Sequence, residues 1–490
     1  MTMDFICYKD IALTEPTIEK NTATTTITLT TRLKQTYSFD LTLQYQDPIP
    51  PEYLPLIRLA FCMPLMNYGL FTERFTLKFP VSSADLSLLN DLNTVFASET
   101  YIHELVKPKA PYLLPGYQIT EEDATAQAAK PKSTFSPESI TTDTPIQKDL
   151  DQMRCGILSS GGKESLTTYG MLKELGIDVH PLYVNESGGH WRTAMTAYRY
   201  HEHTEPNTSK VWTNVDRFYL FMLDHLSFIR KDHRQIRADV YPIRMCIFPY
   251  YVFALMPLFA QRRIGNLLLG SEFDDLRMTP SFKGLVDYYG IYDQDVSFDR
   301  RMNLWYNRRM PGLVQWSALR PVTGLIVERV LFSRYPELAK NQRSCHSCHI
   351  DGDNVIPCGT CSKCMGILLF LMANKIDPRQ IQYTKQAVDS FPSRVKSSNL
   401  KLDQDEKDQS FFLMEGGSGP EVRGVDHVEW IHDGPSCSMS YVPEQFRDGL
   451  LSILEEHTKG YGKLQTGEWV VDNVPRHERS LTMRNASRDP

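Results

Sequence analysis

The chain has 490 residues, of which 41% are hydrophobic and 23% charged, and its formal net charge at pH 7 is -6. A single core stops growing near ~250–300 residues, so this length predicts two or three domains, and the composition excludes fibrous and wholly disordered chains. The negative charge argues against a protein that coats nucleic acid. Arginine pairs at 262–263, 300–301 and 308–309 could still form a local basic groove or be ordinary surface charge.

The N-terminal residues and the most apolar stretch predict a cytoplasmic protein. The first residues carry no basic segment followed by an apolar run, so we expect no secretory signal. The stretch 247–260 contains two prolines and is shorter than the ~20 residues that span a bilayer. We therefore expect no membrane partner.

Residues 1–116 are predicted to form a small α+β domain. Segments 24–33, 37–45 and 73–79 are rich in Thr, Leu, Ile and Tyr, partly with period two, and are predicted strands. From 117 to 150 there are few aliphatic residues, too few to offset the entropy of ordering. We expect this segment to be a flexible linker.

Residues 151–335 show the alternation of strand and helix that is typical of an α/β domain. Strands are predicted at 156–158 and 179–184, with a helix between them that ends at Gly176. Further helices are predicted at 191–203, 215–230 and 248–262, and further strands at 239–243 and 266–269. The pattern predicts an open, doubly wound parallel sheet. A zinc-binding module with a helix is expected at 336–392, and a C-terminal accessory region at 393–490.

After the first of these strands comes the loop Ser160-Gly161-Gly162-Lys163-Glu164-Ser165. Two glycines allow a sharp turn that directs backbone N–H groups at an anion, and the following helix adds about half a positive charge at its N-terminus. Lys163 can contact a phosphate oxygen, and the hydroxyls of Ser160 and Ser165 can donate hydrogen bonds. The spacing is not that of a Walker loop. Phosphate binding is the predicted function, and a Gly-Gly turn with a capping serine is the alternative.

The segment 156–173 resembles the signature SGGxDS of the PP-loop ATP pyrophosphatases. The resemblance implies the adenine nucleotide alpha hydrolase-like fold, cleavage of ATP between the α and β phosphates, and transfer of AMP to a substrate oxygen. It also implies ATP and Mg²⁺ as cofactors, with Lys163 and Ser165 as catalytic residues. Glu164 stands where the family usually has Asp, so its carboxylate lies one methylene further from the backbone.

Five of the ten cysteines lie between 345 and 364, and so tight a cluster in a cytosolic protein indicates metal binding rather than disulfides. Cys358, Cys361 and Cys364 have the spacing of zinc ligands. By spacing alone, the fourth ligand could be Cys345, Cys348 or His349.

The loop and the cysteines together resemble the 7-cyano-7-deazaguanine synthase branch of the PP-loop group, in which a Ser-Cys pair precedes CGxCxxC. The resemblance covers roughly 154–375 and makes Cys345 the fourth Zn²⁺ ligand. The same features also resemble the ATP-dependent UDP-N-acetylmuramoyl-L-alanyl-L-glutamate epimerases, which have an additional N-terminal domain. Both families activate a carboxylate with AMP.

Polar residues at the ends of two predicted strands are further candidates. Asn185 follows the second strand, as do Glu186 and His190, while Gly270 and Glu272 follow the strand at 266–269. Doubly wound sheets place ligands at such strand ends, so we assign Asn185, Gly270 and Glu272 to the cofactor site. Solvated capping loops are the alternative. By contrast, His201 and His203 lack zinc spacing and are predicted to lie on the surface.

These features predict an AMP-forming, ligase-like enzyme. A small-molecule or peptide carboxylate would attack the α phosphate, and ammonia or an amine would then displace AMP. The alternatives are an epimerase with the same activation step, an RNA-modifying relative, and a non-catalytic zinc protein that binds nucleotide as a ligand. The sequence leaves open whether the chain forms a homo-oligomer.

Overall fold

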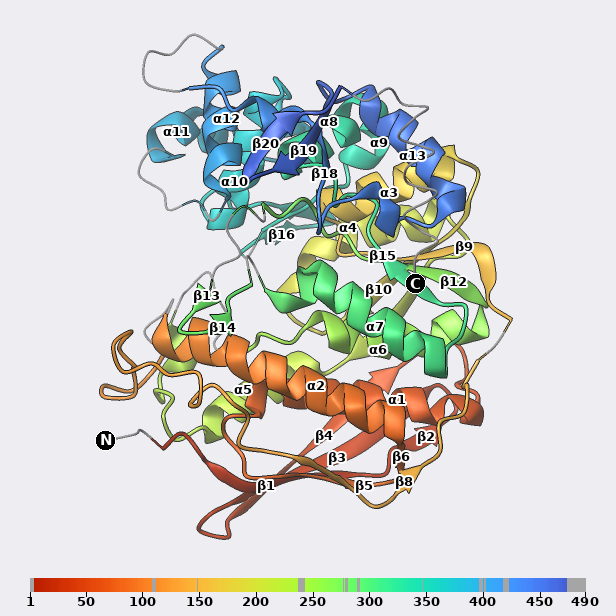
Figure 1. Ribbon diagram of the computed structural model, residues 1–490, viewed down its shortest axis with the longest axis vertical. Coiled ribbons are helices and arrows are strands. Elements are labelled where there is room, and N and C mark those ends of the chain that lie inside the picture. The colour runs from red at the N-terminus through yellow and green to blue at the C-terminus, as the bar shows by residue number, and fades with distance from the viewer. Residues whose placement is uncertain are drawn as a thin grey trace.

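A computed structural model describes residues 4–107, 112–147, 149–236, 243–275, 277, 281–288, 291–345, 347–395, 400, 402–416 and 423–473. It is an α/β structure built on a large mixed sheet of mostly parallel strands (Figure 1). In these residues the sheet has 11 strands. Ten of them follow the order β15 (Val314–Trp316), β12 (Ile264–Leu268), β9 (Asp151–Leu158), β10 (Asp178–Asn185), β11 (Ser209–Thr213), β4 (Thr36–Gln44), β3 (Thr22–Thr31), β1 (Tyr8–Thr14), β5 (Phe75–Lys78) and β7 (Phe135–Pro137); β2 (Thr17–Glu19) pairs with β3.

The parallel half of the sheet is wound in two directions from β9. The chain first adds β10 and β11 on one side of β9, then crosses over to add β12 and β15 on the other side. The loops after β9 and β12 therefore leave the sheet in different directions, which opens a crevice at their carboxyl ends. The predicted strand at 239–243 falls almost wholly outside the described residues.

The N-terminal strands extend this sheet instead of forming one of their own. β4 pairs antiparallel with β11, where Trp212 faces Gln44 and Thr213 faces Leu43. In β3 every second side chain from Ala23 to Leu29 is buried, as expected for a strand with one face on a core. The predicted α+β domain is thus continuous with the parallel sheet.

Helices cover the parallel strands on both faces, and each face has its own large core. One core includes α1 (Leu54–Cys62), α2 (Ser83–Thr100), α5 (Val215–His225), α6 (Phe248–Gln261) and α7 (Val296–Arg309). The other includes α3 (Lys163–Glu174), α4 (Gly189–Thr204), α8 (Gly324–Arg334), α9 (Pro336–Ala339), α10 (Ser362–Ala373), α11 (Lys385–Val395) and α13 (Glu444–Glu455). Gly156 lets α6 pack closely on the sheet, because a Cβ there would lie 2.6 Å from the ring of Phe259 in α6.

The expected linker at 117–150 is docked over much of its length. Its strand β7 pairs with β5, and β8 (Ile140–Thr141) pairs with β6 (Val81–Ser82). Four well-spaced apolar side chains hold it down: Ile119, Ala124, Ala129 and Phe135 are all buried. The sparse aliphatic content of this segment was therefore misleading, because a few anchors suffice when strand pairing satisfies the backbone.

The C-terminal segments lie in the upper part of Figure 1, around α8. They comprise a hairpin of β16 (His349–Asp351) and β17 (Asn354–Ile356), the helix α12 (Gln404–Met414), and a small sheet of β18 (Ile431–Asp433), β19 (Tyr461–Gln465) and β20 (Glu468–Val471). A further hairpin joins β13 (Ser281–Phe282) to β14 (Leu285–Val286). In the part of the chain that the structure describes, every helix is too short or too polar to cross a membrane.

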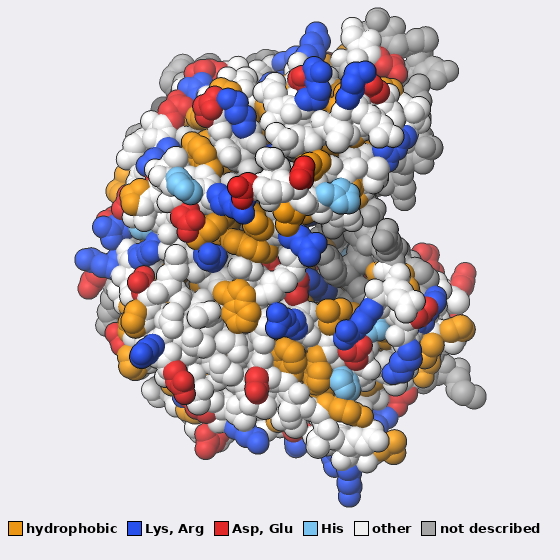
Figure 2. Space-filling view, turned by 180° about the vertical axis from the view of Figure 1, so that it is seen from behind, with side chains coloured by type: hydrophobic (Ala, Val, Ile, Leu, Met, Phe, Trp, Pro, Cys, Tyr) orange, Lys and Arg blue, Asp and Glu red, His pale blue; other side chains and the backbone are white. Residues whose placement is uncertain are grey.

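The arginine pairs are used within the fold. Arg309 is buried against Asp85, and Arg301 pairs with Asp91 on α2. Arg262 donates to the carbonyl of Asn207. On the face seen in Figure 2, positive and negative side chains are interspersed rather than gathered by sign. These contacts favour the interpretation of the pairs as local ion-pair partners over a shared basic groove.

Candidate functional site

The glycine loop lies at the carboxyl end of β9, next to the crossover to β12. Gly161 has φ +74°, and a Cβ there would lie 3.1 Å from Ala197 on α4, so both the backbone conformation and the close approach require glycine. Gly162 is the N-cap of α3 and contributes no side-chain capping bond. The N-terminus of α3 therefore keeps backbone N–H groups that can receive an anion.

The two serines of the loop have different environments. Ser160 is exposed and lines a pocket beside the loop. Ser165 is buried, donates to the carbonyl of Gly162 at 3.3 Å and accepts from Ser159 at 3.2 Å. In this state the Ser165 hydroxyl stabilises the loop, whereas the Ser160 hydroxyl is available to a ligand.

Lys163 is held between two carboxylates. Its Nζ lies 2.5 Å from Oε1 of Glu164 and 2.5 Å from Oε1 of Glu272, and its side chain is 5% exposed. Burial by itself would lower the pKa of Lys163, but the two carboxylates raise it above its usual range. Gly270 permits this arrangement, because a Cβ there would lie 2.6 Å from the Cβ of Glu164. The predicted residues Lys163, Glu164, Gly270 and Glu272 therefore meet in space.

More carboxylates surround Lys163 than one ammonium group can neutralise. Burial raises the pKa of Glu272 to about 8, with the nearby Glu164 and Glu406 contributing, and burial raises the pKa of Glu328 to about 8. Burial likewise raises the pKa of Asp274 to about 7. An acidic cluster of this kind has protonated members near neutral pH or binds an added cation.

Two of these acids come from segments far along the chain. Glu328, on α8, is fully buried and accepts from Nε2 of Gln342 at 3.1 Å. Glu406, on α12, accepts from the backbone N–H of Leu325 at 3.0 Å and so caps the N-terminus of α8. The C-terminal region thus reaches the loop site. Isolated Glu residues at 328 and 406 give no sequence signal of this role.

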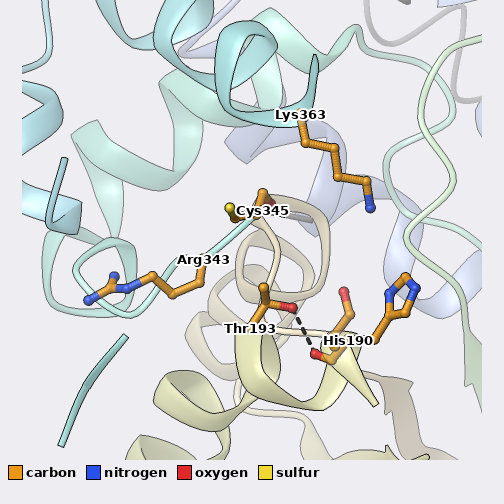
Figure 3. A pocket seen from close by; sticks show the side chains of 8 residues that line it. His190, Thr193, Arg343, Cys345 and Lys363 are labelled. Carbon is orange, nitrogen blue, oxygen red and sulfur yellow. Dashed lines mark hydrogen bonds between the residues drawn. The ribbon is translucent and has the colours of Figure 1, made fainter. Parts of the chain in front are cut away.

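A pocket of about 60 Å³ lies between the loop, α4 and the cysteine-rich turn (Figure 3). It is lined by Ser160, Gly189, His190, Thr193, Arg343, Ser344, Cys345 and Lys363. Lys363 extends toward the pocket in Figure 3, whereas Arg343 turns away and donates to the carbonyl of Val355 at 2.6 Å. Burial opposes the ionisation of Glu164, but Lys163 and Lys363 together hold its pKa below the usual range.

The pocket also reveals residues that the sequence interpretation missed or gave a minor place. In the sequence analysis His190 was only a secondary candidate, and Ser344 and Lys363 were not proposed as ligands. A signal for Lys363 was present, because it is the only basic residue inside the motif 358–364. The sequence gives no comparable signal for Ser344 and His190, because only the fold brings their segments to the loop.

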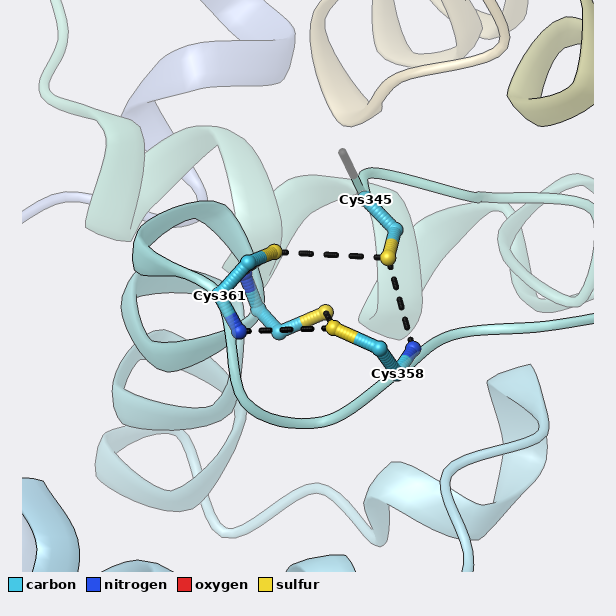
Figure 4. A group of neighbouring side chains, drawn as sticks. Cys345, Cys358 and Cys361 are labelled. Carbon is cyan, nitrogen blue, oxygen red and sulfur yellow. Dashed lines mark hydrogen bonds between the residues drawn. The ribbon is translucent and has the colours of Figure 1, made fainter. Parts of the chain in front are cut away.

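The four cysteines Cys345, Cys358, Cys361 and Cys364 form a cluster that could bind zinc (Figure 4). Their sulfur atoms all lie within 4.8 Å of one another, and the pairs 358–364 and 345–361 are 3.9 and 4.0 Å apart. A tetrahedral site with Zn–S bonds of ~2.3 Å has sulfur atoms about 3.8 Å apart. Backbone N–H groups also point at the sulfurs, as in zinc knuckles: Cys361 N lies 3.3 Å from the sulfur of Cys358. The donor set therefore fits zinc, and Cys348 is not among the four.

Some predicted residues lie outside this arrangement. Asn185 accepts from the backbone N–H of Ser187 at 3.0 Å and shapes the turn after β10 without lining the pocket. Glu186 is buried, so it is not part of a solvated loop. His201 is fully buried and lies 2.7 Å from the hydroxyl of Tyr183, so the prediction that it lies on the surface is wrong.

A second group with metal-ligand spacing consists of Asp275, Asp405 and His427. Arg277 bridges the two carboxylates, and Asp405 lies 2.9 Å from Nε2 of His427. Arg277 therefore already offsets part of the negative charge of the two carboxylates. Its evident role is to fasten α12 to the loop that follows β12.

Comparisons with known proteins do not constrain the assignment. No family model, curated protein or solved structure matches the chain. The function must therefore be inferred from the residues and their geometry.

Proposed function

We propose that this chain is an enzyme that cleaves ATP to AMP and pyrophosphate and so activates a substrate carboxylate for attack by ammonia or an amine. The observation that carries the proposal is the position of the loop 160–165 at the carboxyl end of β9, facing Glu272 after β12. In doubly wound sheets this switch point is where ligands bind. A glycine-rich helix N-terminus at that point suits a phosphate chain.

The order of the parallel strands supports the PP-loop assignment. Counted from β9 in chain order, the five strands lie in the order 3-2-1-4-5, which is that of the common doubly wound sheet. The SGGxDS-like motif falls directly after the first strand, as the resemblance to the PP-loop enzymes implies. A fold of this kind hosts several activities, so the proposal depends on the loop and its carboxylates rather than on topology.

The residues of the site have separable roles in this proposal. Backbone N–H groups at the start of α3 and the hydroxyl of Ser160 bind phosphate oxygens. Glu164 and Glu272 would hold Mg²⁺, which would neutralise charge on the phosphates. Lys163 lies between these two carboxylates and holds them in position. Electrostatic stabilisation of the leaving pyrophosphate and orientation of the two reactants would supply the rate enhancement.

Zinc has a structural role in this scheme. The four sulfur ligands complete a tetrahedral shell and leave no open position for water or substrate. The cysteine cluster packs in the same core as α3 and α8. Its metal would therefore hold the wall of the site in place.

The nature of the products tests the proposal. ATP incubated with the protein, Mg²⁺ and a panel of amino-acid and peptide carboxylates should give AMP and pyrophosphate, whereas ADP would refute the reaction. A carboxylate labelled with ¹⁸O should pass one labelled oxygen to AMP when an amine captures the intermediate. The variant Glu272→Gln should lower turnover by roughly 10²–10³, the size of losing one preorganised electrostatic contact.

An epimerase is the second candidate, because it shares the activation step and the chain has extensive N-terminal structure joined to the parallel sheet. Activation of a carboxylate acidifies the neighbouring C–H bond. In D₂O an epimerase would exchange that hydrogen and release AMP without incorporating an amine. Amine incorporation without exchange would exclude this alternative.

A further inference from the structure

The lysine of the loop and the lysine of the cysteine-rich turn have opposite environments. Lys163 is buried, and Glu164 and Glu272 already compensate its charge. Lys363 is exposed at the pocket, and none of the described residues forms a hydrogen bond or ion pair with its ammonium group. Of the two lysines, it is therefore Lys363 whose charge is available to a ligand.

The pocket offers the groups that recognise a phosphate. Its volume of about 60 Å³ exceeds the ~10–15 Å³ that a cavity needs to hold one water molecule. The hydroxyls of Ser160 and Ser344 lie on its wall. The first turn of α4 forms another wall, and its N-cap, Gly188, supplies no side-chain capping bond. Hydroxyls, helix N–H groups and an ammonium group are together suited to an anion.

The cysteine cluster and this pocket are one structural unit. Lys363 lies between the cluster members Cys361 and Cys364, and Cys345 both lines the pocket and belongs to the cluster. The segment leading to Cys345 also contacts the loop, because Arg343 N donates to the carbonyl of Gly161 at 3.0 Å. Anything that holds the four sulfurs in place therefore also fixes the position of Lys363 relative to Ser160.

We propose that Lys363 binds the phosphate groups that leave as pyrophosphate. The cysteine-rich turn that carries Lys363 would then be part of the nucleotide-binding site. This inference rests on the proposed function and assigns to Lys363 the phosphate contact that the motif suggests for Lys163. It predicts that metal occupancy and anion affinity are coupled, since the metal fixes the turn that carries the lysine.

Titration calorimetry with inorganic pyrophosphate and the zinc-loaded, full-length protein tests the assignment. We expect Lys363→Met to weaken pyrophosphate binding about 10- to 100-fold, the effect of losing one charged hydrogen bond. Lys363→Arg should restore most of the affinity, because it keeps the charge. Lys385→Ala is the matched control, since Lys385 lies on α11 of the same module and is 82% exposed. The pyrophosphate affinity of this variant should equal that of the wild type. Zinc content is measured for every variant.

The outcomes separate this inference from the proposed function. Wild-type affinity in a zinc-replete Lys363→Met protein overturns the role of Lys363, even if ATP is still cleaved to AMP. Equal losses in the zinc-replete Met and Arg variants also overturn it, because the charge would then be irrelevant. A specific loss in Lys363→Met without any ATP cleavage by the wild type supports the anion pocket and refutes the enzyme proposal. If Lys363→Met loses zinc, the zinc-replete Lys363→Gln variant takes its place: a tenfold or greater loss of pyrophosphate affinity supports the role, and wild-type affinity overturns it.

Discussion

Replacing Lys163 with methionine removes the one ammonium group held between Glu164 and Glu272 while keeping the length of the side chain. At an effective dielectric constant of ~20, two unit charges ~4 Å apart attract by about 4 kcal/mol, and breaking a buried ion pair costs about 3–5 kcal/mol. Glu164 and Glu272 keep 29% and 23% of their side chains exposed. Water therefore screens part of the interaction, and we expect a loss near the lower end, about 3 kcal/mol at pH 8.

The pH dependence makes this test specific. Without Lys163 the pKa of Glu272 rises further above its value in the unfolded chain, and the pKa of Glu164 rises from its lowered value. The folded variant therefore binds protons that the unfolded state does not. The variant should therefore regain stability as pH falls and lose it as pH rises through the raised pKa values. Urea denaturation followed by tryptophan fluorescence at pH 5.5 and 8.5 measures this. The double variant Lys163→Met/Glu272→Gln should recover much of the loss at pH 8.5. A single variant within 1 kcal/mol of the wild type at both pH values would refute the reasoning.

Three further predictions follow from the described contacts. Burial raises the pKa of Glu328 from 4.5 to about 8, so its contribution to stability is complete below about pH 4.5, falls by about 1.4 kcal/mol per pH unit between there and pH 8, and is constant above pH 8. Glu328→Gln should therefore flatten the pH dependence of denaturation midpoints between about pH 5 and 7.5, and an unchanged slope contradicts this. Elemental analysis should find one zinc per chain, lost in Cys345→Ser and kept in Cys348→Ser, and the reverse result would move the fourth ligand. Phe135 is buried in β7 and stacks on Phe75 with centroids 4.7 Å apart, so Phe135→Ala should cost about 3 kcal/mol; a loss below 1 kcal/mol would mean that the segment is as loose as its composition suggests.

Local patterns predicted the elements around the site well, because they depend on neighbouring residues. The strand at 179–184 is found as β10, and the helices at 191–203 and 248–262 as α4 and α6. The docking of 117–150 could not be predicted in the same way. Its anchors, such as Ile119 and Phe135, are too far apart to make a periodic pattern, and the strand partner of β7 lies some 60 residues earlier.

For the site, the sequence by itself determined the chemistry of two short motifs. The glycines of 160–165 and the thiols of 358–364 specify a turn at a helix N-terminus and a sulfur cluster through bonds and hydrogen bonds between near neighbours. Only the tertiary structure decided that Lys163 is compensated by Glu272 and that Lys363 lies beside Ser160. It also decided that Glu328 and Glu406 join the acidic cluster around Lys163. Glu272, Glu328, Lys363 and Glu406 all lie more than 100 positions along the chain from the glycine loop. Whether a lysine faces a carboxylate or an open pocket depends on how the helices pack against the sheet, and no local spacing encodes that packing.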